Sequence, residues 1–153
     1  ELSEFKNDNS VEFVFGIGGK FKINSSSIIT DEFLLKFRNK AFQKKPWGSF
    51  INLNKGNGYK IKLLVVKKDQ KLSFQYHNRR SEQWIILRGT ALIQLEDKLF
   101  EMKAKDHIII PKKAKHRVEN IGNDDLLILE ANFGSYIEED DIVRLEDIYN
   151  RVV

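Results

Sequence analysis

Hydrophobic and polar residues alternate in short runs through most of the chain after Trp47. Runs rich in β-branched and aromatic side chains recur at intervals of roughly eight to twelve positions, with turn residues between them. They span residues 59–66, 71–77, 83–87, 90–95, 99–102, 107–110, 116–120 and 126–133. This cadence favours an antiparallel barrel or sandwich over alternating strands and helices. We therefore predict a mostly β fold.

Two segments show helical spacing instead. Thr30 is suited to cap a helix, and apolar residues at 33, 34, 37, 41 and 42 form a stripe, which predicts a helix near 30–43. After an acidic stretch at 138–141, apolar residues at 142, 145, 148 and 149 predict a second helix near 138–152. We accordingly divide the chain into 1–43, an extension or linker with one helix, and 44–153, a barrel domain.

Composition narrows the kinds of site that this barrel can hold. The 153 residues include no Cys, so disulfides and thiolate zinc sites are excluded, and a metal would need nitrogen and oxygen ligands.

The sequence has neither a signal-peptide pattern at its start nor an apolar run of the roughly 18 residues that a membrane span needs. We expect a soluble, cytoplasmic protein with no membrane partner. Because the sequence begins with Glu1 and not Met, we also expect a piece of a longer chain.

The net charge of +4 comes mostly from scattered Lys and suits an anionic partner, either a phosphorylated metabolite or a nucleic acid. The densest basic stretches, 67–71 and 112–115, lie in predicted turns and carry neither interleaved aromatic residues nor a nucleic-acid motif. We expect no nucleic-acid partner.

Candidate chemistry centres on two of the three histidines. His107, flanked by an isoleucine run, is interpreted as structural. In the strand predicted at 71–77, residues two apart share a face, so Ser73, Gln75 and His77 point one way and the aromatic residues 74 and 76 the other. A buried glutamine beside a histidine needs polar partners. A metal ion would supply them.

Spacing farther along the chain resembles the two motifs of the cupin superfamily. Glu82 is followed after six residues by Gly89, and His116 is followed after three residues by Asn120. The resemblance implies a cupin barrel, a double-stranded β-helix, in which Glu82 and His116 join His77 as metal ligands. Ordinary cupins carry His-x-His in the first motif, and here Arg79 occupies the second position. The set is complete if Gln75 takes its place.

Seven blocks in order are similar to type II phosphomannose isomerase, the C-terminal domain of bifunctional mannose-1-phosphate guanylyltransferase/mannose-6-phosphate isomerase. They lie at 45–50, 58–62, 70–77, 80–84, 89–91, 115–120 and 134–144, and the resemblance covers roughly 44–152. It implies a metal-dependent isomerase that interconverts mannose 6-phosphate and fructose 6-phosphate through a cis-enediol, in GDP-mannose biosynthesis. The chain lacks the Gly-rich signature of a guanylyltransferase, so that activity would lie elsewhere in a parent chain.

The resemblance also implies roles for individual residues. The metal ligands are Gln75, His77, Glu82 and His116. The metal is a divalent cation, with zinc the first choice, and nickel, cobalt, manganese or iron would fit these ligands nearly as well.

Arg80 is the first catalytic candidate, because a cation beside the metal ligands would stabilise a developing enediolate. Candidate phosphate ligands are Lys62, Lys115 and Arg144. The proton-transfer base stays unassigned, because strand alternation from His116 turns Glu119 away from the metal face.

Four positions depart from the family pattern. Arg79 and Gln83 stand where the family has histidines, and Asp69 and Lys113 replace turn glycines, with a backbone strain of about 1 kcal/mol expected at Lys113. The first two departures support an alternative: a catalytically weak cupin that serves as a sugar-nucleotide binding or oligomerisation module of a mannose-1-phosphate guanylyltransferase. A homodimer is left open. A basic nucleic-acid-binding barrel is the least favoured alternative.

Overall fold

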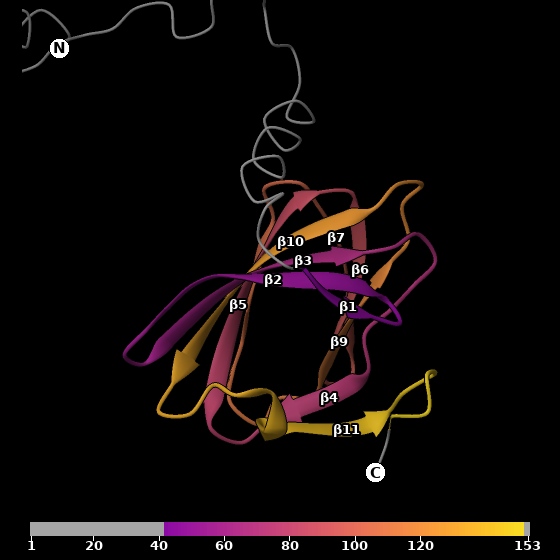
Figure 1. Cartoon of the computed structure of the whole chain (residues 1–153). Helices are drawn as coiled ribbons and strands as arrows, with labels where there is room; N and C mark the ends of the chain where they lie inside the picture. Colours follow the sequence, from indigo (N-terminus) through magenta and orange to yellow (C-terminus); the bar gives the residue numbers. More distant parts are fainter. Residues whose placement is uncertain (1–41, 152–153) are drawn as a thin grey trace, which may run out of the picture.

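The computed structural model describes residues 42–151, which form two antiparallel sheets facing each other (Figure 1). The strands are β1 (Gln43–Lys45), β2 (Gly48–Gly56), β3 (Tyr59–Val66), β4 (Phe74–His77), β5 (Arg80–Arg88), β6 (Thr90–Leu95), β7 (Lys98–Lys103), β8 (His107–Ile110), β9 (His116–Asn120), β10 (Leu126–Gly134) and β11 (Ile142–Glu146). A single turn of 3-10 helix, η2 (Glu139–Asp141), precedes β11. The predicted β fold is confirmed.

The six-stranded sheet has the order β1-β2-β3-β10-β5-β8, and the five-stranded sheet the order β11-β4-β9-β6-β7. The chain passes from one sheet to the other between β4 and β5, across the two residues 78 and 79. Gly89, between β5 and β6, has a φ of 93°, a conformation that glycine adopts without strain. The cupin spacing from Glu82 to Gly89 thus ends at the turn where the chain changes sheet again.

The inner face of the six-stranded sheet changes from apolar to polar along its strands. Three rows of buried residues cross β3, β10 and β5 in register: Leu64, Ile128 and Ile86; Lys62, Glu130 and Trp84; and Lys60, Asn132 and Glu82. The first row belongs to the hydrophobic core between the sheets. Buried polar groups need partners. The polar end of the interior is therefore where a site is expected.

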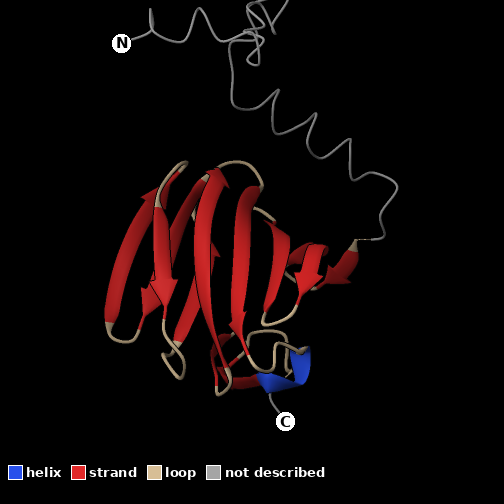
Figure 2. Ribbon diagram, turned by 90° about the vertical axis from the view of Figure 1, so that its left-hand side faces the viewer, coloured by secondary structure: helices blue, strands red, loops and turns tan. Residues whose placement is uncertain are grey.

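The helix predicted near 138–152 is wrong. Only η2, the short blue helix in Figure 2, is helical among the described residues of this segment. Ile142 begins a strand that pairs with β4, starting opposite His77. Without β11, one edge of β4 would expose unpaired backbone N–H and C=O groups, and this pairing outweighs the weak helical spacing of the apolar residues.

The helix predicted near 30–43 lies outside the described residues except for its last two positions, and Gln43 already belongs to β1. Within residues 42–151, no helix is long and apolar enough to cross a membrane.

Candidate metal centre

Three of the predicted ligands meet between the sheets. His77 ends β4, Glu82 lies near the start of β5 and His116 begins β9. In β4 and β9 the burial alternates, and the predicted inward residues are the buried ones. The ligand atoms of the three side chains lie within 4.8 Å of one another, and each side chain is at most 2% exposed. The structure thus places a group that could hold a metal ion at the polar end of the interior.

Glu82 stands between the two histidines. Its Oε1 lies 3.0 Å from His77 Nε2 and its Oε2 lies 3.6 Å from His116 Nε2. Arg80 Nε donates to Oε1 and Trp84 Nε1 donates to Oε2, both at 3.0 Å. Burial alone would raise the pKa of Glu82, but the hydrogen bond and charge of His77, with His116 and Arg80, hold it well below the usual value. Glu82 is therefore an ionised carboxylate at neutral pH.

His116 provides the test of whether this group suits a metal. Its Nδ1 lies 2.9 Å from the carbonyl oxygen of Ala114, which can only accept, so Nδ1 carries the proton and Nε2 has the lone pair. That Nε2 is buried and has no hydrogen-bond partner. Burial lowers the pKa of His116, which favours the neutral ring. A buried, unpartnered lone pair directed at a carboxylate fits a site for a cation.

His77 is oriented in a similar way, except that its Nε2 has polar partners. Its Nδ1 lies 3.4 Å from the carbonyl oxygen of Asp141, while Nε2 faces Glu82. The two imidazole rings lie 5.1 Å apart between centroids. In both histidines a backbone carbonyl can orient the ring, as is usual for metal-binding histidines.

Gln75 lies next to this group. It is buried, and it pairs with His116 across β4 and β9 and with Arg144 across β4 and β11. Ser73 Oγ donates to Gln75 Oε1 at 2.6 Å. The amide oxygen can accept this bond and still offer a second lone pair. Gln75 is therefore positioned beside the three ligands, and its role as a fourth stays a prediction.

Arg80 is 2% exposed, so it is no surface residue. Besides Glu82, its Nη1 donates to the carbonyl oxygen of Glu138 at 2.8 Å, and its Nη2 lies 3.3 Å from His77 Nε2. These contacts fix the guanidinium against two of the predicted ligands. They engage three of the five N–H donors of the group.

The three candidate phosphate ligands lie in different surroundings. Lys62 is buried, with Nζ 2.6 Å from Glu139 Oε1 and 3.3 Å from Glu130 Oε1. Burial lowers the pKa of Lys62, but Glu130 and Glu139 outweigh it, and the net pKa is raised. Lys115 is exposed and does not line the pocket beside the metal group. Arg144 is half-buried and lines that pocket.

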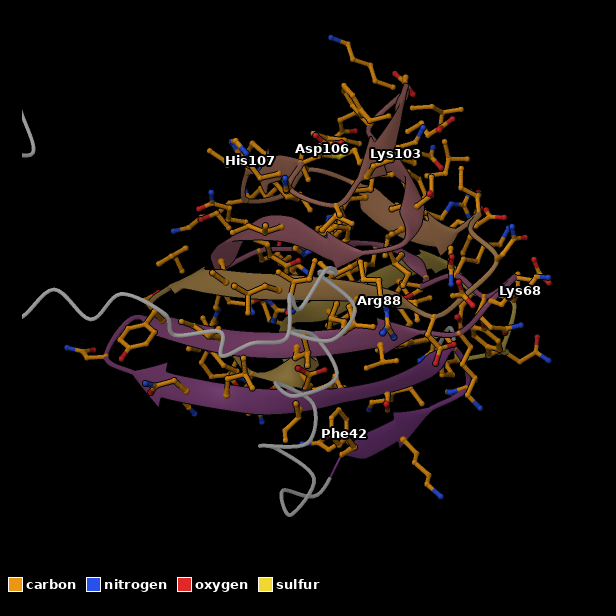
Figure 3. The ribbon with its side chains drawn as sticks, turned by 90° about the horizontal axis from the view of Figure 1, so that it is seen from above. Phe42, Lys68, Arg88, Lys103, Asp106 and His107 are labelled. Atoms are coloured by element: carbon orange, nitrogen blue, oxygen red, sulfur yellow. The ribbon has the colours of Figure 1, made fainter. Side chains whose placement is uncertain are left out.

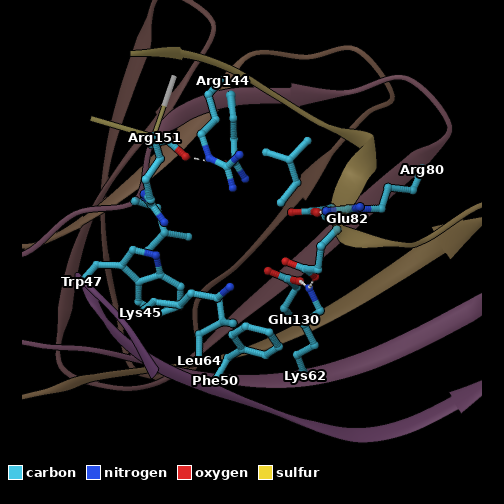
Figure 4. Close-up of a pocket in the computed structure, with 15 residues that line it drawn as sticks. Lys45, Trp47, Phe50, Lys62, Leu64, Arg80, Glu82, Glu130, Arg144 and Arg151 are labelled. Carbon is cyan, nitrogen blue, oxygen red and sulfur yellow. Dashed lines mark hydrogen bonds and ion pairs between the residues drawn. The ribbon is translucent and has the colours of Figure 1, made fainter. Parts of the chain in front are cut away.

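The pocket adjoins the metal group and is shown in Figure 4. Arg80, Glu82, Lys62 and Glu130 lie on one side of it, and Arg144, Arg151, Trp47 and Lys45 on the other. The side chains leave a partly open space of about 40 Å³. The exposed His107 lies elsewhere, beside Asp106 on the outside of the molecule (Figure 3).

Several residues of the site were missed from sequence. Glu130 and Asn132 interrupt the apolar strand at 126–133, and this alternation was the signal that could have identified them. Asp141 accepts the backbone N–H groups of Asn78 and Arg79 at 3.3 and 3.1 Å. Its role was hidden because the acidic stretch was interpreted as the first turn of a helix.

Comparison with solved structures identifies the fold. KdgF from Halomonas sp. superposes with a TM-score of 0.60 at 13% identity, over 67% of this chain and 92% of that one. The cupin domain of Schizosaccharomyces pombe Cnp3 superposes with a TM-score of 0.59 at 15% identity, over 64% and 71%. The two-sheet barrel is a cupin fold.

Comparison with sequences gives a nearer relationship. Alginate biosynthesis protein AlgA of Pseudomonas aeruginosa is 41% identical over 107 residues, which are 70% of this chain and 22% of that protein. Mannose-1-phosphate guanylyltransferase ManC of Salmonella typhimurium is 39% identical over 108 residues, 71% of this chain and 22% of that protein. The chain thus spans less than a quarter of the length of either relative. The family model described as mannose-6-phosphate isomerase C-terminal matches residues 32–147, and the chain belongs to this family.

Proposed function

We propose that the chain is a metal-dependent mannose-6-phosphate isomerase domain, the C-terminal part of a bifunctional guanylyltransferase/isomerase in GDP-mannose biosynthesis. The observation that carries the proposal is the buried group of His77, Glu82 and His116, in which His116 Nε2 has no hydrogen-bond partner. The family and the guanylyltransferase relatives support the substrate and the pathway. Zinc is the expected metal.

The reaction interconverts an aldose and a ketose and needs a polarised carbonyl, a stabilised enediolate and a bound phosphate. A divalent cation held by Gln75, His77, Glu82 and His116 would polarise the carbonyl oxygen as a Lewis acid. Arg80, fixed by Glu82 and the Glu138 carbonyl, has N–H donors left to stabilise the enediolate oxygen. Because these partners hold the guanidinium in place, it needs little reorganisation during the reaction.

The pocket must open to accept a hexose phosphate. Its partly open space of about 40 Å³ is far below the roughly 300 Å³ or more of typical small-molecule sites. Lys45, Arg144 and Arg151 line it with long side chains that are half-buried. We propose that these side chains move outward when the sugar binds.

The alternative of a catalytically weak module rests on Arg79 and Gln83. Neither residue is buried or lines the pocket, and Gln83 lies between the inward Glu82 and Trp84 on β5, on the opposite face of the strand. Arg79 instead places its guanidinium 5.1 Å from the centre of the Tyr136 ring. These departures lie off the face that carries the metal group, which favours the isomerase.

A coupled assay of fructose 6-phosphate formation from mannose 6-phosphate, with zinc and then other divalent metals, tests the proposal. We expect turnover and stoichiometric metal in the purified protein, and loss of both in His116→Ala. For Gln75→Ala we expect weaker metal binding and at least a tenfold loss of activity, about 1.4 kcal/mol. His107→Ala is the matched control, since this histidine is exposed and outside the site. Stoichiometric metal without turnover under any metal would favour the weak module.

A further inference from the structure

The pocket beside the metal group has two ends of different charge. At the metal end, each cation has a carboxylate partner: Arg80 contacts Glu82, and Lys62 contacts Glu130 and Glu139. At the other end, Lys45, Arg144 and Arg151 line the same pocket and come from three separate parts of the chain (Figure 4). Arg151 pairs there with Asp147, whereas no ion pair with a carboxylate joins Lys45 or Arg144 among the described residues.

Arg144 is the member whose hydrogen bonding is incomplete. Its Nε is buried and has no hydrogen-bond partner among the described residues. A buried N–H donor without a partner is costly, so the half-buried guanidinium of Arg144 is expected to serve a ligand. Arg151, in contrast, makes a two-pronged contact with Asp147 through Nε and Nη2 at 2.8 and 2.7 Å. Lys45 Nζ lies 5.4 Å from the centre of the Phe50 ring, so it retains its ammonium donors.

The register of the sheet places this cationic end at a defined distance from the metal ligands. Gln75 on β4 lies opposite both His116 on β9 and Arg144 on β11. Arg144 is thus two strand spacings from His116, about 10 Å. That is comparable to the length of an open-chain hexose 6-phosphate, whose carbonyl and phosphate groups are at opposite ends.

We propose that Lys45, Arg144 and Arg151 form the subsite that binds the phosphoryl group of the sugar phosphate, with Arg144 in direct contact. The assignment rests on the proposed isomerase function for its biological ligand. It moves the phosphate away from Lys62, which is neutralised by two carboxylates, and from Lys115, which lies outside the pocket. A guanidinium suits this task because its planar fork can donate two parallel hydrogen bonds to phosphate oxygens.

Calorimetric titration of the metal-free protein with inorganic phosphate tests the subsite apart from catalysis. We expect saturable binding in the wild type, about tenfold or more weaker in Arg144→Gln and also weakened in Lys45→Gln. Arg144→Lys keeps the charge without the fork and is expected to fall between the two. Arg117→Gln is the matched control, because Arg117 pairs with Glu146 and does not line the pocket. Thermal unfolding of each variant confirms that it is folded.

Steady-state kinetics on mannose 6-phosphate separate the two proposals. For Arg144→Gln in the metal-loaded protein we expect KM to rise at least tenfold while kcat and metal content change little. No saturable phosphate binding in the wild type, or equal affinity in Arg144→Gln, would overturn the subsite even if the protein is an active isomerase. Conversely, phosphate binding that depends on Arg144 in a protein without turnover would leave the subsite standing and remove the isomerase.

Discussion

Lys62 holds a buried positive charge between Glu130 and Glu139, and its replacement tests how much the polar end of the interior depends on it. For Lys62→Met we expect the free energy of unfolding at pH 7 to fall by about 3 kcal/mol, because Glu130 is left buried without its counter-ion. Urea unfolding measures the change. Lys55→Met is the control: its ion pair with Glu138 is exposed to solvent, so its loss is expected to change the stability little.

The ion pair of Lys62 with Glu139 makes the stability depend on pH in a defined direction. The pKa of Lys62 is raised, so its stabilising charge is present below its ordinary pKa of 10.5 and is lost only as the pH rises through the higher value. Burial acts to raise the pKa of Glu139, but Lys62 outweighs it and the net pKa is lowered, so its contribution is present above 4.5 and is lost as the pH falls. The destabilisation by Lys62→Met should therefore shrink below pH 4.5 and persist at pH 9. An equal difference at pH 3.5 and pH 7 would contradict this account.

Lys113 tests a second residue-scale expectation. The sequence predicted backbone strain at Lys113, which like Asp69 replaces a turn glycine, and the two residues have positive φ of 66° and 58°. Lysine tolerates this conformation less well than aspartate. We expect Lys113→Gly to raise the free energy of unfolding by about 1 kcal/mol. Lys112→Gly, at a neighbouring exposed position without positive φ, should give no gain, and the melting temperatures of the two variants compare them directly.

At the scale of elements, the segment from Glu138 to Asp141, which precedes β11, contacts residues at and beside the metal site. The Glu138 carbonyl accepts from Arg80, Glu139 pairs with Lys62, and Asp141 caps the backbone between β4 and β5. Since that turn separates His77 from Arg80, the segment positions both residues without belonging to the ligand set.

Asp141→Ala tests this positioning role. Two backbone N–H groups would lose their acceptor, and the carbonyl that faces His77 Nδ1 would be less firmly held. We expect a roughly 10-fold or greater loss of zinc affinity, measured by competition with a chelator. Asp140→Ala is the control, since its exposed carboxylate accepts from Tyr136 Oη. Asp141→Asn should restore part of the affinity, and unchanged affinity in both Asp141 variants would refute the role.

These elements also show how far the sequence could be interpreted. Strand alternation placed Gln75 and His77 inward and Glu119 outward correctly, because in a sheet with one buried face the period of two is decisive. The interpretation of apolar spacing failed at 142–149. Four apolar residues there satisfy a helical spacing, but the segment forms a strand whose pairing partner, β4, is far away in sequence. In the site, spacing motifs located His77, Glu82 and His116, and the polar interruption of the apolar strand at 126–133 could have marked Glu130, whereas Asp141 depends on tertiary contacts that no local pattern encodes.

At the scale of the whole molecule, the metal group links the two sheets. His77 and His116 come from the five-stranded sheet, and Glu82 from the six-stranded sheet. Because a cation would bind only the folded arrangement, metal at about 100 times its Kd should add about 2.7 kcal/mol of stability. Chelation by EDTA is thus expected to lower Tm by roughly 5–10 °C. Calorimetric scans with and without zinc measure it, with His116→Ala as the variant that should not respond.

The position of this link between sheets also bears on the time course of folding. His116 is distant along the chain from His77 and Glu82, so we expect the group to be complete only after β9 has paired with β4. Contacts that form after the transition state change the unfolding rate and leave the folding rate nearly untouched. Bound metal would therefore slow unfolding. It would prolong the lifetime of the folded barrel against proteases and heat without hastening its formation.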